Sequence, residues 1–242
     1  MISEIEMLES RLCLSAAVTP GATLSPSGVL SVVGDRNAAN TISVKLSSDG
    51  TQIDTAVGTD TDSFALADVK RVVVMGGDQA DSINVDLTDA NLNFSTVIIG
   101  RAGDDTITGG GENDVIWGRA GDDVIDAGGG NDKVFGGDGD DVITGGAGDD
   151  KLYGGFGDDT IDGGDGNDVL VGGDDADSLT GGAGDDTLVG DSDEGDVLDG
   201  GDGTNDVRDL ADSSGEYGGG SGGGGHCGGY GGDYGYGGYR HR

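Results

Sequence analysis

The sequence predicts an all-β protein built as a stack of short, similar coils, and three observations carry the prediction. Ten nine-residue repeats follow one another without an insertion from Gly100 to Val189. Each repeat has Asp at its sixth position and Ile, Leu or Val at its eighth. Glycine fills 54 of the 242 positions, which suits tight turns but leaves little apolar surface for a large core. A repeated local interaction must therefore help to order the chain.

Residues 1–27 are interpreted as a leader or N-terminal segment. The stretch from Leu8 to Ala16 resembles a short element found near the N-terminus of many predicted exported proteins of environmental bacteria, with Cys13 where that element has Leu. The first residues lack the basic stretch of a secretory signal. The second cysteine, Cys227, lies at the opposite end of the sequence, so an isolated thiol is expected at each position; a disulfide between the two ends is the alternative.

For residues 28–99 the sequence predicts wider, irregular coils that cap the open end of the stack. The stretch from Gly76 to Ile83 keeps Asp81 and Ile83 in the register of the repeat, and the stretch from Gly34 to Ile42 has Asn40 in place of the Asp. Alternating apolar and polar residues at 41–46 and an apolar run at 72–74 read as strands between these turns. A separate small β-sandwich is the alternative for this segment.

Residues 100–209 are predicted to form the regular part of the stack. The repeat from Gly136 to Thr144 matches G-G-x-G-x-D-x-U-x in full, where U is a large aliphatic residue. The glycines at positions one, two and four permit positive φ and tight turns. After Val189 the register slips by one residue, and Asp196 preserves the centre of one further turn.

This pattern closely resembles the RTX, or haemolysin-type, calcium-binding repeat family. The resemblance implies a parallel β-roll in which a six-residue turn alternates with a three-residue strand and two repeats complete one coil. It also implies calcium as the ligand, held by the aspartates at position six: Asp105, Asp114, Asp123, Asp132, Asp141, Asp150, Asp159, Asp168, Asp177, Asp186 and, with less regular surroundings, Asp196.

The chemistry of calcium agrees with that implication. Calcium takes 6–8 oxygen ligands from carboxylates and carbonyls, more than one Asp per turn supplies, so an ion must sit between stacked turns and share their oxygens. At 18 residues per coil the aspartates form two rows of five, and the gaps between turns would take about eight ions. Sites beside irregular turns should be weaker: those with Arg101 or Arg119 at position two, Glu112 or Asp175 at position four, and Ala127 at position one.

One outer face of the predicted roll carries an apolar stripe. Position eight points inward, so position nine points outward, and on one sheet it reads Trp117, Phe135, Tyr153, Val171 and Val189. Contiguous apolar patches tend to mark contact surfaces, which favours a partner protein, a second copy, or a glycan stacked on the rings. Cross-strand stacking that only stabilises the sheet is the alternative.

Residues 210–242 are rich in glycine and tyrosine and predict a flexible, disordered tail. The two histidines, His226 and His241, also fall there, and Gly-rich matches to catalytic motifs in the tail lack the strand and helix that such motifs require. The sequence therefore predicts no enzyme active site.

The composition of the chain limits which partners it can bind and where in or outside the cell it is expected to act. The net charge of −35 argues against nucleic acid, and no apolar run is long enough for a membrane span. We expect a secreted, extracellular or cell-surface protein that folds on calcium and acts as a structural or adhesive module. The alternative is a non-catalytic RTX part associated with a secreted enzyme. Ice binding is disfavoured because Asp126 and Asp162 interrupt the row of threonines on the other face.

Overall fold

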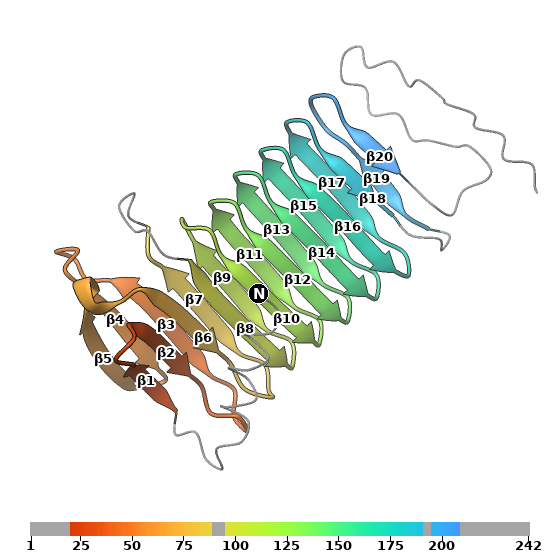
Figure 1. The fold of residues 1–242 in the computed structure, drawn as a ribbon. Helices are drawn as coiled ribbons and strands as arrows, with labels where there is room; N and C mark the ends of the chain where they lie inside the picture. Colours follow the sequence, from red (N-terminus) through yellow and green to blue (C-terminus); the bar gives the residue numbers. More distant parts are fainter. Residues whose placement is uncertain (1–19, 89–94, 191–194, 209–242) are drawn as a thin grey trace, which may run out of the picture.

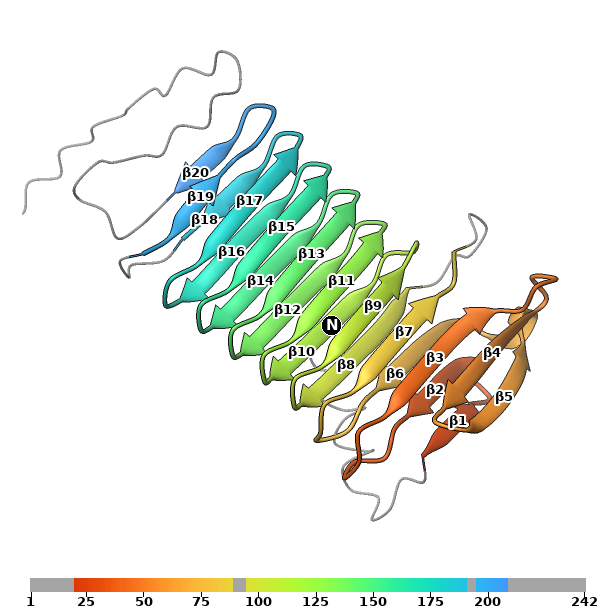
Figure 2. The same cartoon turned by 180° about the vertical axis from the view of Figure 1, so that it is seen from behind.

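The computed structural model describes residues 20–88, 95–190 and 195–208. These residues form an elongated stack of coils in which two sheets lie back to back, with strands β1 to β5 at one end and strands β18 to β20 at the other (Figures 1 and 2). The all-β parallel solenoid expected from the repeats is confirmed. The predicted tail and most of the predicted leader lie outside the described residues.

Successive strands of the roll alternate between the two sheets. The first sheet contains, in spatial order, β1 (Gly21–Leu24), β2 (Val29–Val33), β6 (Arg71–Met75), β8 (Thr96–Ala102), β10 (Val115–Ala120), β12 (Lys133–Asp138), β14 (Lys151–Phe156), β16 (Val169–Asp174), β18 (Thr187–Val189) and β20 (Asp206–Arg208). The second contains β19 (Val197–Asp199), β17 (Ser178–Ala183), β15 (Thr160–Asp165), β13 (Val142–Ala147), β11 (Val124–Gly129), β9 (Thr106–Gly110), β7 (Ser82–Asp86), β3 (Thr41–Leu46), β4 (Gln52–Val57) and β5 (Asp60–Ala65).

Pairing within the roll is parallel and in register at a spacing of one coil. On the first sheet Lys133 pairs with Lys151, and on the second Val124 pairs with Val142. At the N-terminal end β1 pairs with β2, β3 with β4, and β4 with β5 in antiparallel fashion. The strands of residues 28–99 thus belong to the same two sheets as the roll, and antiparallel strands form one outer edge of each sheet.

Strands in the regular roll are longer than the resemblance implies. Strand β13, for example, runs over six residues from Val142 to Ala147, so positions one to three of each repeat join the strand and the turn shrinks to positions four to six. Burial alternates along it: Ile143 at position eight and Gly145 at position one are buried, whereas Val142 and Ala147 are exposed. The inward direction predicted for position eight is confirmed.

The core is a single column of aliphatic side chains between the sheets. Each regular strand contributes one, such as Ile116, Ile143 or Leu170. A second buried cluster lies on the outward side of the first sheet near its N-terminal end and consists of Val33, Val73, Met75, Val97 and Ile99, with Trp117 packed against it. The single helical element of the described chain is the short 3-10 helix Leu66–Asp68, and none of its helices could span a membrane.

Candidate metal centre

The position-six aspartates form two straight rows along the edges of the roll. The backbone N–H of Asp105 donates to Oδ1 of Asp123 at 2.8 Å, and the backbone N–H of Asp114 donates to Oδ1 of Asp132 at 2.7 Å. The same bond recurs from rung to rung with N···O distances of 2.7–2.9 Å. One row runs Asp105, Asp123, Asp141, Asp159, Asp177, Asp196; the other runs Asp114, Asp132, Asp150, Asp168, Asp186 and then Asn205.

The second carboxylate oxygen of these aspartates is buried and has no hydrogen-bond donor. This holds for Oδ2 of the ten aspartates from Asp105 to Asp186. Each of the ten residues is nearly inaccessible, with 1–2% of its surface exposed. A buried, unpartnered carboxylate is strongly destabilising while it is charged, so ten of them at one-coil spacing fit either protonation or a bound cation.

Backbone carbonyls approach the same small space as the free oxygens. A Cβ placed on Gly145, at position one, would lie 2.5 Å from Oδ2 of Asp150 and 2.6 Å from the carbonyl oxygen of Gly163 in the next coil. Gly100 has the same relation to Asp105 and Gly118. Carboxylate and carbonyl oxygens together are the donors that calcium prefers, so the residues fit the ion that the resemblance implies.

Side chains alone would not complete such a site. Across residues 20–88, 95–190 and 195–208, no three His, Cys, Asp or Glu side chains converge in the manner of a metal-binding cluster. Most of the 6–8 calcium ligands would therefore be backbone carbonyls of the turns, with the aspartates supplying the charge.

The glycines of the turn are required for two different reasons. At positions two and four the backbone has positive φ, as in Gly137 (137°) and Gly139 (130°). Gly136 at position one has no positive φ, contrary to the expectation for that position; a Cβ there would lie 2.1 Å from Oδ2 of Asp141. Glycine is favoured at position one because the carboxylate approaches the space of the side chain; Ala127 is the one exception among the ten repeats.

The rows hold their carboxylates in surroundings that disfavour charge. Burial raises the pKa of Asp123 to about 7; the N–H of Asp105 opposes this rise, and the charges of Asp105 and Asp141 add to it. Burial is also the largest cause for the other affected aspartates: the pKa rises to about 8 for Asp132, about 7 for Asp105, Asp114 and Asp159, and about 6 for Asp141, Asp150 and Asp168. A divalent cation would remove this penalty.

A second ladder, at position five, was not recognised in the sequence. The backbone N–H of Asp140 donates to Oδ1 of Asp122, and that of Asp158 donates to Oδ1 of Asp140, so this exposed ladder runs opposite to the buried one. Asn131 and Asn113 are linked in the same way on the other edge. Position five is Asp or Asn in every repeat except at Ala176, and that restriction was the available signal.

The irregular turns carry backbone strain where glycine is missing. Arg101, Arg119 and Asp175 have φ values of 98°, 93° and 81°. Residues other than glycine rarely adopt this conformation, which costs on the order of 1 kcal/mol each. The weaker binding predicted beside these turns, and beside Ala127 and Glu112, stays a prediction.

Comparison with known families identifies the repeats. The family model of the RTX calcium-binding nonapeptide repeat matches the chain four times in overlapping copies, over residues 99–134, 126–161, 135–170 and 162–195. No curated protein sequence matches the chain.

Proposed function

Because residues 99–195 belong to the RTX calcium-binding nonapeptide repeat family, we propose that this chain is a calcium-folded structural module that acts outside the cell or on its surface. In this proposal the ions lie between successive turns of each row, where Asp105 to Asp186 supply the charge, and Asp196 borders the last gap of the first row. Five regular turns on each edge would accommodate about eight ions in total.

The observation that carries the proposal is the set of buried carboxylate oxygens without donors. Ten Oδ2 atoms lie in the interior edges of the roll and have no hydrogen-bond partner. Folding the roll without a cation would leave each of them unsatisfied, at a cost of about 1–3 kcal/mol or more per atom. A bound calcium between turns supplies the positive charge that these oxygens lack.

Charge repulsion makes the dependence on calcium stronger. Residues 100–189 carry 23 acidic and four basic residues, a net charge of −19. Each regular strand offers one aliphatic side chain to the core, so apolar burial opposes this repulsion only weakly. We infer that the roll is open without calcium and closes when calcium neutralises the rows.

An extracellular setting would fit folding that depends on calcium. Extracellular calcium modules bind in the range of about 10⁻⁴–10⁻³ M, far above the free calcium inside cells. The roll would then stay open until export and fold outside. The repeats form a calcium-binding scaffold rather than a catalytic domain, and a structural or adhesive role fits a rigid rod.

The aromatic stripe has a more local role in this proposal. Trp117 stacks on Phe135 with ring centroids 5.7 Å apart, and Phe135 stacks on Tyr153 at 5.0 Å. Nζ of Lys133 lies 4.8 Å from the centroid of Phe135. The faces of the rings are thus stacked against each other, which supports a stabilising role for the stripe. Contact of the stripe with a partner protein, a second copy or a glycan stays a prediction.

Calorimetric titration with calcium tests the proposal directly. The full chain, freed of metal, should bind several calcium ions per molecule, gain β signal in the far-UV circular dichroism spectrum and become more compact. Magnesium is the matched control, because its small size and strict octahedral geometry suit carbonyl-rich turns poorly. An unchanged spectrum and hydrodynamic radius after chelation would refute the proposal.

A further inference from the structure

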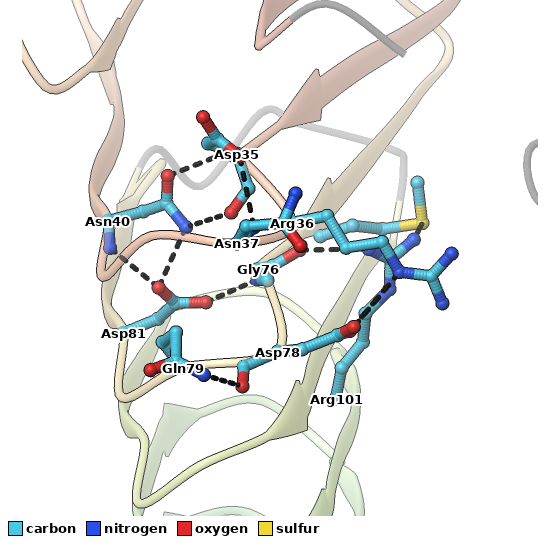
Figure 3. A network of polar contacts seen from close by, with 11 residues as sticks. Asp35, Arg36, Asn37, Asn40, Gly76, Asp78, Gln79, Asp81 and Arg101 are labelled. Carbon is cyan, nitrogen blue, oxygen red and sulfur yellow. Dashed lines mark hydrogen bonds and ion pairs between the residues drawn. The ribbon is translucent and has the colours of Figure 1, made fainter. Parts of the chain in front are cut away.

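Two irregular turns stand at the N-terminal beginning of the first row of aspartates. Asn40 ends one of them and Asp81 ends the other, and they face each other across the stack (Figure 3). The backbone N–H of Asn40 donates to Oδ1 of Asp81 at 2.6 Å, and the backbone N–H of Asp81 donates to Oδ1 of Asp105 at 2.7 Å. The row therefore continues through Asp81 and begins at Asn40.

The side-chain amide of Asn40 brings donors into this first gap. Its Nδ2 lies 2.9 Å from the carbonyl oxygen of Asp35 and 2.8 Å from Oδ1 of Asp81 (Figure 3). It also lies 2.8 Å from the carbonyl oxygen of Ala38. Its Oδ1 accepts the backbone N–H of Asp35 at 2.7 Å, which fixes the orientation of the amide. Two turn carbonyl oxygens and one carboxylate oxygen thus converge on the amide nitrogen of Asn40. Carbonyl and carboxylate oxygens are also the usual ligands of calcium in proteins.

Asp81 consequently differs from the aspartates of the regular roll. Its Oδ1 accepts both the backbone and the side-chain N–H of Asn40, and its Oδ2 accepts the backbone N–H of Gly77. Both carboxylate oxygens are therefore satisfied within the protein, although the residue is buried. In the roll, by contrast, Oδ2 of the equivalent Asp has no donor.

Two arginines add positive charge around the same turns. Nε of Arg36 forms an ion pair with Asp78 at 3.1 Å, which joins the two irregular turns. Nη1 of Arg101 donates to the carbonyl oxygen of Gly76 at 3.2 Å (Figure 3). Arg36 and Arg101 thus add fixed positive charge and donors beside the turns that end at Asn40 and Asp81.

The N-terminal coils also have a fuller core and a weaker charge than the roll. Strands β2, β3, β6 and β7 each place two large aliphatic side chains in the core, such as Ile42 and Val44 of β3, whereas regular strands place one large side chain there. Residues 20–88 carry nine acidic and four basic residues, far closer to balance than residues 100–189. Apolar burial here faces much less repulsion.

We propose that the gap between the turns ending at Asn40 and Asp81 takes no calcium, because the Asn40 amide supplies the donors there. Residues 21–86 then stay folded without calcium and form a ready-made end on which the roll assembles when calcium arrives. This inference rests on the proposed calcium-dependent folding of the roll. At the other end, Asn205 closes the second row: the backbone N–H of Asp186 donates to its Oδ1, and its Nδ2 donates to the carbonyl of Gly200.

Hydrogen exchange of the full chain, read by mass spectrometry with calcium and with chelator, tests the inference. Peptides from residues 29–86 should stay protected in both conditions, whereas peptides from residues 106–189 should be protected only with calcium. Fast exchange of residues 29–86 in chelator would overturn the inference. Protection of residues 106–189 in chelator would instead refute the calcium-dependent folding of the roll.

A charge-matched pair of variants tests the role of the amide itself. Asn40→Asp replaces the donor with an acceptor, so in chelator residues 29–86 should exchange at least about tenfold faster than in the wild type. In calcium the variant should bind one additional ion. Asn37→Asp adds the same charge to the same turn at an exposed side chain and should change neither result. Equal behaviour of the two variants would overturn the assignment to Asn40; if Asn40→Asp fails to fold, the wild-type exchange pattern decides.

Discussion

At the scale of single residues, the two aspartates of each turn have different tasks. Asp141 is buried, and its Oδ2 has no donor, whereas Asp140 is exposed and its Oδ1 accepts the backbone N–H of Asp158. The two residues are adjacent in sequence, but the side chain of Asp141 is buried and that of Asp140 is exposed to solvent. Replacing Asp141 with Asn removes one charge from the buried position, and replacing Asp140 with Asn removes one from the exposed position. Both substitutions keep a side-chain oxygen that can accept a hydrogen bond.

We expect Asp141→Asn to weaken calcium binding by an order of magnitude or more at the gaps on both sides of its turn, since ligand charge sets calcium affinity. Asp150→Asn should behave in the same way on the other edge. Asp140→Asn should retain calcium affinity and stoichiometry. Calorimetric titration measures both quantities, and equal losses for Asp140→Asn and Asp141→Asn would contradict the stacked-site interpretation.

The hydrogen bonds of Asp81 assign it a role in the stability of the N-terminal coils. Because the repeat around Asp81 has decayed, we expect Asp81→Ala to have little effect on calcium binding. The structure adds that its loss would remove the acceptor of the backbone N–H groups of Asn40 and Gly77, and one of the three acceptors of the Asn40 side-chain amide. We therefore expect Asp81→Ala to leave calcium stoichiometry unchanged while it lowers the thermal stability of residues 21–86, as followed by hydrogen exchange.

Backbone strain at position four offers a separate test. Asp175 has φ of 81°, so Asp175→Gly should relieve strain and raise the stability of the calcium-loaded roll by a net of about 0.5–1 kcal/mol after the entropy of glycine is counted. Glu112 holds the same position in the turn from Gly109 without positive φ. Glu112→Gly removes the same charge and should give no such gain. Thermal unfolding in excess calcium compares the two variants.

At the scale of elements, the first sheet is stiffened by the rings on strands β10, β12 and β14. Replacing Trp117, Phe135 and Tyr153 together with Thr removes two stacked pairs, each with a contribution of about 0.5–1.5 kcal/mol. We expect a lower melting temperature of the calcium-loaded roll. Val171→Thr with Val189→Thr, on the same face, is the control and should cost less.

The same triple variant separates the two roles of the stripe. Loss of stability with unchanged oligomeric state and unchanged binding to surfaces would leave the stripe a purely stabilising feature. A changed oligomeric state, or lost binding to a surface at unchanged stability, would instead establish the contact role. Size-exclusion chromatography with light scattering reports the first quantity directly.

At the scale of the whole molecule, the raised pKa values link folding to pH. Burial raises the folded-state pKa of Asp123 to about 7 and of Asp132 to about 8, above the ordinary value of 3.8. A group whose pKa is raised by folding stabilises the fold fully below its unfolded pKa and loses that contribution as pH rises through the folded value. Calcium-free roll should therefore be most stable in mild acid and least stable at pH 8.

We expect the metal-free chain to gain β signal and to become more compact as pH falls from 8 towards 5. Calcium needs the ionised carboxylates, so its affinity should fall over the same range, and binding near neutral pH should release protons. Circular dichroism of dialysed protein and titration in buffers of different ionisation enthalpy measure these effects. A metal-free roll that loses structure on mild acidification would contradict the buried, unpartnered state of the rows.

The repeating parts of this protein were predictable from the amino-acid sequence. A strict period of nine, with Asp at position six and an aliphatic residue at position eight, predicts a stacked solenoid and its inward face, because each coil repeats the same local interaction. The resemblance to the RTX repeat added two repeats per coil, hence two rows of aspartates, and calcium as the ion. The outward direction of Trp117, Phe135 and Tyr153 followed from the same alternation. The division into four segments stays an interpretation.

Contacts between neighbouring coils could be seen only in the folded molecule. The sequence did not distinguish a glycine required by φ, such as Gly137, from Gly136, which is required because Oδ2 of Asp141 fills its side-chain space. Nor did it indicate that positions one to three join the strand, or that the rings stack on one another. The Asn40 amide faces Asp81 across 41 residues of chain. Where the spacing between coils is irregular, contacts are set by three-dimensional packing, which no local period records.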